Sequence, residues 1–219
     1  MVDAADVLVF DMDGVLVDVR ESYREAIIRT VEHFTGKRVS KETIQDYKNQ
    51  GGYNNDWILS RKICQDLGVE VPYATVVDQF NEVFLNQGLI HRERWLPKDG
   101  LMERLASRCE LAIFTGRNQV EVEITLRREG YLTQFLVITS DDVEHEKPAP
   151  DGLLKIATLR PGKKLLYVGD TVDDARAAKA AGVPFIGICA PDSLRHDEIV
   201  ALLNAEGAFA VLEDINEIG

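Results

Sequence analysis

Two aspartates directly follow a short apolar run near the start of the chain. The run Val7 to Phe10 leads into Asp11 and Asp13 within the stretch VLVFDMDGVLVD. In an extended segment residues 11 and 13 lie on the same side, and Gly14 allows the chain to turn away. Two close carboxylates repel each other unless a cation joins them, so the pair suggests a hard divalent metal such as Mg²⁺. A loop of solvated acids would show the same pattern.

Two later apolar runs also end in polar groups that could act on an anion. The run Leu111 to Phe114 is followed by Thr115, Gly116 and Arg117, which offer a hydroxyl, an unhindered backbone N–H and a guanidinium. Lys147 precedes a proline in EHEKPAP, and the proline stiffens the loop that presents the ammonium group. Both sites suit the binding of phosphoryl oxygens.

A fourth run, residues 165 to 168, is followed by GDTVDD, which adds Asp170, Asp173 and Asp174. Ligands of open α/β sheets bind beyond the carboxyl ends of the strands. Each of these groups is a weak signal by itself. Their repetition after four successive predicted strands indicates one site.

The elements that must position these groups alternate between short apolar runs and helical patterns from residue 97 onward. Alternation of this kind predicts an α/β fold with a parallel sheet covered on both faces. The apolar run at 7 to 10 lacks alternation, as expected for a central strand. The remaining strands are expected at Leu111 to Phe114, Phe135 to Ile138, Leu165 to Val168, Pro184 to Ile188 and Ala208 to Leu212, with helices such as Gln119 to Glu129 and Asp174 to Ala181 between them.

Residues 18 to 96 show consecutive helical patterns and no convincing strand. A first helix should end at Gly36, a second begin near Ser40, and a third run from about Asn55 to Gly68, followed by a fourth from Tyr73. We therefore expect a helical insert at 18–96 in a core domain formed by residues 1–17 and 97–219.

The motifs DMDGVLVD, FTGR, KPAP and GDTVDDARAAKAAG, in this order, resemble those of the haloacid dehalogenase superfamily, subfamily IA. The insert is similar to the C1-type helical cap of its phosphoglycolate phosphatase and β-phosphoglucomutase-like branch. The resemblance covers essentially the whole chain and implies a Rossmann-like core.

The resemblance also implies residue roles. Asp11 would be the nucleophile that forms an aspartyl phosphate, and Asp13 would protonate the leaving group and then activate water. Mg²⁺ would be held by Asp11, the Asp13 backbone carbonyl and Asp170. Phosphoryl oxygens would be bound by Thr115, the Gly116 N–H and Lys147, with Asp174 orienting Lys147 or a metal-bound water.

The sequence and the resemblance leave open the roles of two further acids. Asp173 is expected to be a solvated neighbour of the site. Asp18 matches a common acidic position, and either it has a role in the site or it braces the hinge of the insert. The presence of Asp13 points to phosphoryl transfer, because a halide leaves carbon without a proton.

The resemblance places a specificity loop between the second and third helices of the insert, at KNQGGYNNDW. Candidate contacts to the leaving group are Lys48, Asn49, Gly51, Gly52, Asn54, Asn55 and Arg117. A polar turn with Asn55 as a helix cap would explain the same composition. Tyr23 continues an apolar helical stripe and is expected to pack inside the insert.

These features predict a Mg²⁺-dependent phosphatase acting on a small phosphorylated metabolite. A phosphomutase would use the same core residues, and a binding module without turnover is the third alternative. The net charge of −12 disfavours nucleic-acid and membrane partners. The start MVDAAD has no signal pattern, so a cytoplasmic protein with free thiols is expected. The sequence leaves open whether it is a monomer or a homodimer.

Overall fold

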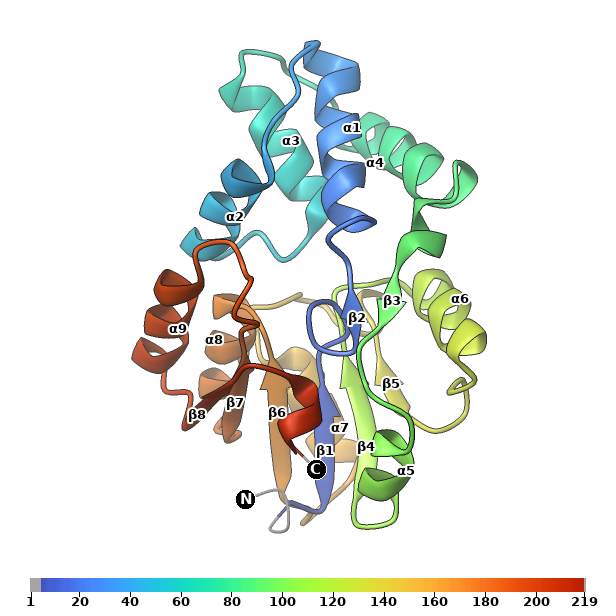
Figure 1. The fold of residues 1–219 in the computed structure, drawn as a ribbon, viewed down its shortest axis with the longest axis vertical. Coiled ribbons are helices and arrows are strands. Elements are labelled where there is room, and N and C mark those ends of the chain that lie inside the picture. Colours follow the sequence, from blue (N-terminus) through green and yellow to red (C-terminus); the bar gives the residue numbers. More distant parts are fainter. Residues whose placement is uncertain (1–4, 219) are drawn as a thin grey trace.

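The sheet is the centre of the computed structural model, which describes residues 5–218 (Figure 1). Residues 1–4, which include the first part of MVDAAD, and residue 219 lie outside the described chain. Within residues 5–218 the sheet has six strands in the order β5-β4-β1-β6-β7-β8, with every neighbouring pair parallel. The strands are β1 (Val7–Phe10), β4 (Glu110–Phe114), β5 (Leu136–Ile138), β6 (Leu165–Gly169), β7 (Phe185–Ile188) and β8 (Ala210–Leu212).

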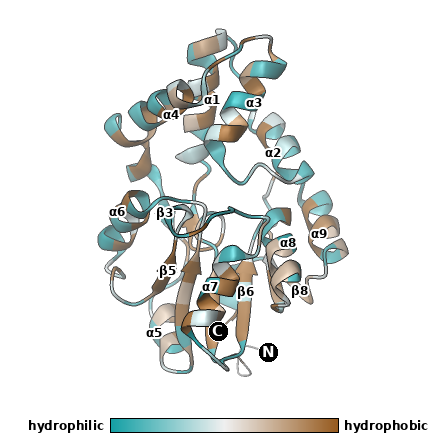
Figure 2. Cartoon of the chain, turned by 180° about the vertical axis from the view of Figure 1, so that it is seen from behind, coloured by the Kyte–Doolittle hydropathy of each residue, from teal (hydrophilic) through white to brown (hydrophobic). Residues whose placement is uncertain are grey.

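Helices cover both faces of this sheet, as the alternating pattern predicts. They are α5 (Leu101–Ala106), α6 (Gln119–Glu129), α7 (Asp151–Leu159), α8 (Val172–Ala181) and α9 (His196–Ala205). In β1, Leu8 and Phe10 pack with α5 and α6, whereas Val7 and Val9 pack with α7, α8 and α9. The strand is therefore apolar at every position because both of its sides are buried, and Figure 2 shows the labelled strands β5 and β6 mainly in brown.

The insert forms a helical layer beyond the edge at which the parallel strands end (Figure 1). Its helices are α1 (Tyr23–Thr35), α2 (Lys41–Gln50), α3 (Asp56–Asp66) and α4 (Tyr73–Asn81), the last continuing as a π-helical turn over Glu82–Asn86. They bury a hydrophobic cluster of their own that includes Ile27, Leu59 and Phe80.

Local signals in the insert place the helix ends correctly. Ser40 and Asn55 accept backbone N–H groups as N-caps of α2 and α3, and Gly36 ends α1 in a left-handed conformation. The expectation of no strand here is wrong, because β3 (Arg94–Trp95) pairs antiparallel with β2 (Val17–Asp18). A ladder of two residues is too short to show an alternating pattern.

The structure of residues 5–218 also bears on the expectations about membrane-spanning helices and cysteines. None of the helices in residues 5–218 has the length and apolar character needed to cross a membrane. Cys64, Cys109 and Cys189 are free thiols, and Cys109 is only partly buried.

Candidate active site

The polar groups that follow the parallel strands meet at one edge of the sheet. Asp11 follows β1, Thr115 follows β4, and Asp170 follows β6. Lys147 lies in the loop after β5, and Asp174 stands in the first turn of α8. Strand order brings these residues together, because β1 lies between β4 and β6.

Lys147 is the cation at the centre of this group. Its Nζ donates to Asp11 Oδ1 and to Asp174 Oδ1, both at 2.7 Å, and its side chain is fully buried. Asp174 also accepts from the Tyr167 hydroxyl at 2.6 Å and the Thr171 hydroxyl at 2.6 Å. Although burial alone would raise it, the pKa of Asp174 is lowered by Lys147 and by these hydrogen bonds. Asp174 is therefore a fixed anion that orients Lys147.

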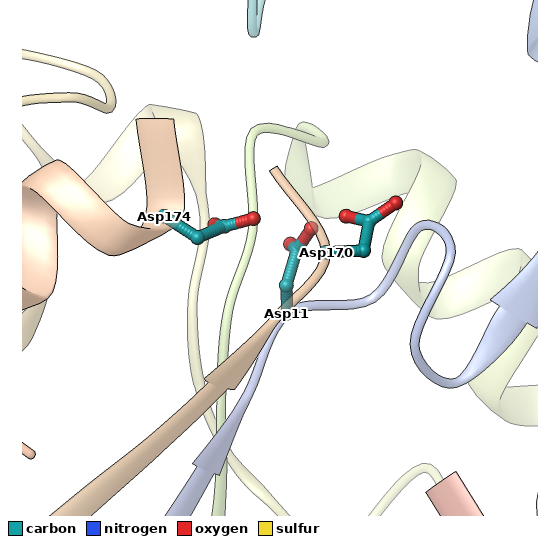
Figure 3. A group of neighbouring side chains, drawn as sticks. All are labelled: Asp11, Asp170 and Asp174. Atoms are coloured by element: carbon teal, nitrogen blue, oxygen red, sulfur yellow. The ribbon is translucent and has the colours of Figure 1, made fainter. Parts of the chain in front are cut away.

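Three carboxylates lie close enough to share a cation. Oxygen atoms of Asp11, Asp170 and Asp174 lie within 4.8 Å of one another (Figure 3). Burial raises the pKa of Asp11 to about 7 and also raises that of Asp170, with the neighbouring carboxylates adding to both shifts. This repulsion would be relieved by a positive ion.

Asp170 carries a buried carboxylate oxygen that is free to bind a ligand. Its Oδ1 is buried and has no hydrogen-bond partner among the described residues, whereas the oxygens of Asp174 already accept several hydrogen bonds. Gly14 has φ 75°, and a Cβ there would lie 2.0 Å from Asp170 Oδ2, so only glycine lets the chain pass. Carboxylate oxygens of this kind fit a hard divalent cation such as Mg²⁺.

Asp13 lies at the wall of a small cavity beside this cluster, with its side chain 32% exposed. Arg117 Nε donates to Asp13 Oδ1 at 2.6 Å. The Arg117 side chain is 1% exposed and also contacts Glu93, so most of it lies behind the cavity wall. The sequence suggested Arg117 as part of an anion-binding group with Thr115 and Gly116 and as a contact to the leaving group, but not as a partner of Asp13.

The cavity has a volume of about 60 Å³ and is enclosed by both layers of the molecule. The sheet side contributes Asp11, Asp13, Thr115, Gly116, Arg117, Glu121, Asp170 and Thr171; the insert side contributes Val19, Tyr23, Arg24, Lys48, Asn54, Asn55, Asp56, Trp57 and Phe80. A Cβ at Gly116 would lie 2.3 Å from Asn54 Nδ2, so glycine permits the close approach of the loop. A space of this size suits a phosphoryl group with a small substituent.

Only some of the candidate specificity residues lie at the cavity. Lys48, Asn54 and Asn55 line the cavity, whereas Asn49 lines a neighbouring cavity of about 180 Å³. Gly52 lies apart from both, and its N–H donates to the two carboxylate oxygens of Asp173 at 2.9 Å. Gly51, the residue before it, adjoins Asp173 and Arg176, since a Cβ there would meet both side chains.

Asp173 is therefore not the solvated neighbour that the sequence suggested. It is 2% exposed because the loop of the insert covers it. Asp18 is likewise buried, and it accepts hydrogen bonds from Arg20 and Arg94 beside the β2–β3 ladder. These contacts hold together the two chain crossings, β2 and β3, where the chain passes between sheet and insert.

Sequence reasoning missed several polar residues of the site. Tyr167, inside an apolar strand, gave no signal by spacing, and neither did Glu93. Glu121 could have been noticed as the third residue of a capping box begun by Asn118. Burial raises the pKa of Glu121 to about 7. Tyr23 packs on Phe84 within the insert as expected, and it also faces the cavity.

A family model described as haloacid dehalogenase-like hydrolase matches residues 8–188. An imidazoleglycerol-phosphate dehydratase from Phytophthora nicotianae is 33% identical over 207 residues, which are 88% of this chain and 45% of that protein. The chain thus spans less than half the length of this relative.

Two further similarities cover most of both partners. The pyrophosphatase PpaX of Bacillus velezensis is 24% identical over 185 residues, which are 83% of this chain and 82% of the relative. The crystal structure of a predicted phosphoglycolate phosphatase from Haemophilus somnus 129PT superimposes with a TM-score of 0.79 at 19% identity, covering 98% of this chain and 96% of the other. At this identity the structural similarity concerns the fold.

Proposed function

The chain belongs to the haloacid dehalogenase-like hydrolase family, and from this premise we propose that it is a Mg²⁺-dependent phosphatase of small phosphate monoesters. The observation that carries the proposal is the Asp11 carboxylate held by Lys147 beside the open oxygen of Asp170. The names of the Bacillus and Haemophilus relatives, a pyrophosphatase and a predicted phosphoglycolate phosphatase, support the same reaction class.

In the first step Asp11 attacks phosphorus in line, and the bond to the leaving oxygen breaks. Asp13 gives its proton to that oxygen, so an alcohol leaves and an aspartyl phosphate forms. The Thr115 hydroxyl and the Gly116 N–H are suited to hold phosphoryl oxygens. Lys147 offsets negative charge on Asp11 during attack.

In the second step Asp13, now ionised, takes a proton from water that attacks the aspartyl phosphate. Inorganic phosphate leaves and Asp11 is restored. The carboxylates of Asp11 and Asp170 and the backbone carbonyl of Asp13 would hold Mg²⁺. Once bound, the ion would supply positive charge against the repulsion between Asp11 and the phosphate.

We assign residues 18–96 the role of a cap, with residues 1–17 and 97–219 as the catalytic core. The cavity accepts a small phosphorylated metabolite in this proposal, and Lys48, Asn54 and Asn55 are the insert's polar contacts to its leaving group. Three free cysteines suit a reducing compartment such as the cytoplasm.

Phosphate release from 4-nitrophenyl phosphate tests the proposal. We expect hydrolysis that is abolished by a chelator, restored by Mg²⁺ and lost in Asp11→Asn. Parent-like activity of Asp11→Asn would contradict its role as nucleophile, and it would leave a binding module or another nucleophile as the alternative. A panel of phosphoglycolate, pyrophosphate, imidazoleglycerol phosphate and β-glucose 1-phosphate then searches for the substrate.

A phosphomutase is the nearest alternative, because only the access of water or a sugar hydroxyl to the aspartyl phosphate differs. Conversion of β-glucose 1-phosphate to an isomer without free phosphate would favour the mutase. Release of inorganic phosphate from any member of the panel, at a rate at least comparable to that of isomerisation, supports the phosphatase.

A further inference from the structure

Arg117 is a charged residue whose side chain is almost completely removed from water, at 1% exposure. Its backbone is fixed to the sheet domain, because its N–H donates to Thr115 Oγ1 and its carbonyl accepts from the Ser140 N–H. Only the side chain can therefore reach other parts of the molecule. A buried guanidinium requires partners on several sides.

One end of the guanidinium holds Asp13. Arg117 Nε lies 2.6 Å and Nη2 lies 2.5 Å from the same oxygen, Asp13 Oδ1. Both contacts go to Oδ1, which leaves Oδ2 to exchange a proton with a leaving group in the cavity. The Nε hydrogen bond and the Nη2 ion-pair contact both restrain this oxygen, and the five donors of a guanidinium allow more such contacts than a lysine ammonium does.

The two Nη groups also contact Glu93, which belongs to the insert. Arg117 Nη2 lies 2.8 Å from Glu93 Oε1, and Nη1 lies 3.3 Å from Oε2. The Glu93 side chain is 0% exposed, and its Oε2 also accepts from Thr125 at 2.8 Å. Glu93 directly precedes β3, where the chain crosses from the insert to the sheet.

Tyr23 provides a second link to the insert. Its ring, at the start of α1, lies 4.8 Å from the Arg117 guanidinium carbon, within the range of a cation–π contact. Tyr23 follows the first chain crossing and Glu93 precedes the second. Any movement of the insert about these crossings therefore changes the surroundings of Arg117.

We propose that Arg117 is a positioning residue, which aligns the Asp13 carboxylate and ties this alignment to the position of the insert through Glu93 and Tyr23. The inference rests on the proposed phosphatase activity. Proton transfer by Asp13 would then be efficient only with the insert seated over the site. Arg117 acts on the leaving group through Asp13 and need not touch the substrate.

The experiment compares kcat/KM for two phosphate esters, because this ratio reports steps up to the first irreversible one and so excludes release of phosphate from Asp11. 4-Nitrophenyl phosphate has a leaving group that needs little protonation, whereas 2-phenylethyl phosphate has an alkoxide that needs a proton. In Arg117→Lys we expect the alkyl ester to lose about 10- to 100-fold and the aryl ester less than about 3-fold.

Glu93→Gln extends the test to the insert. This variant keeps the size of the side chain but removes its charge, and Glu93 does not line the cavity. We expect the same selective loss for the alkyl ester, and a double variant with Arg117→Lys no worse than Arg117→Lys alone by more than about 3-fold. Glu32→Gln, which makes the same change in an exposed ion pair with Arg38 inside the insert, is the matched control and should change kcat/KM for neither ester.

Equal losses of kcat/KM for the two esters would overturn the inference. A higher KM as the main effect of Arg117→Lys would also overturn it and would indicate that Arg117 contacts the substrate. An additive double variant would overturn the link to Glu93. Should the parent enzyme not hydrolyse 4-nitrophenyl phosphate, the proposed function itself is what fails. Melting curves test whether each variant is folded, and Glu93→Gln carries the test if Arg117→Lys does not fold.

Discussion

The insert meets the sheet domain along two seams of opposite character. The crossing seam lies where the chain passes between insert and sheet. In it the buried Glu93 pairs with the buried Arg117, and the buried Asp18 pairs with the more exposed Arg20. The loop seam is formed by the contacts Gly52–Asp173, Asn55–Glu146 and Asp46–Arg195. It consists of two contacts in which one N–H donor meets both oxygens of a carboxylate, and of one ion pair between side chains that are about half exposed.

The two seams differ in whether water can solvate their polar groups once the contacts are broken. Exposed ion pairs contribute about 0–1 kcal/mol, since water solvates the separated charges. A buried charge that loses its partner costs about 3–5 kcal/mol. We therefore expect the insert to separate from the sheet first at the loop seam, with the crossing seam as the hinge at which the surroundings of Arg117 change, so that the cavity can open without loss of the fold.

Glu93→Leu should have the largest effect on stability, because it removes the buried negative charge that Arg117 meets on the insert. We expect the free energy of unfolding to fall by about 3–5 kcal/mol, measured by urea denaturation. A loss below about 1 kcal/mol would show that the crossing seam is no stronger than the loop seam.

Asp18→Asn should have the next largest effect and a characteristic pH dependence. Burial would raise the pKa of Asp18, yet hydrogen bonds from Arg20 and Arg94 lower it below its usual value. Its stabilisation is thus complete above the unfolded pKa of about 4 and is lost as pH falls toward the folded pKa. The variant should be about 1–2 kcal/mol less stable at pH 7, and the difference should shrink below about pH 4. A difference that widened in acid would contradict the pairing.

Asp173→Ala should loosen the loop seam with a smaller effect on stability. Loss of the bond to Gly52 is expected to cost about 1 kcal/mol, because the loop can be solvated once detached. Limited proteolysis should cleave within residues 48–57 faster than in the parent. Asp197→Ala, on the exposed surface of α9, is the control, and equal cleavage of both variants would argue against a role for Asp173 in closure.

Asp46→Asn should have the smallest effect. Its ion pair with Arg195 is exposed, so we expect a change within about 0.5 kcal/mol that becomes smaller still at high salt. A loss of 2 kcal/mol or more would mean that the loop seam depends on this pair.

The fold followed from the sequence where the signals were local. Apolar runs marked the strands, and caps such as Ser40 and Asn55 marked helix starts within one residue. The predicted strand Ala208 to Leu212 begins two residues later, at Ala210, because an edge strand is bounded by pairing and not by composition. The β2–β3 ladder was missed because it exists only through contact between residues far apart.

By itself the sequence suggested the chemical groups of the site, because each stands after a predicted strand, directly or in the loop that follows, and a parallel sheet gathers strand ends at one edge. Asp11, Lys147 and Asp170 could be named for this reason. Tertiary structure alone decided what the connecting residues do. Arg117 pairs with Glu93 of the insert, and Asp173 is buried under Gly52; both outcomes depend on where a helical insert comes to rest on the sheet. No local pattern encodes that placement.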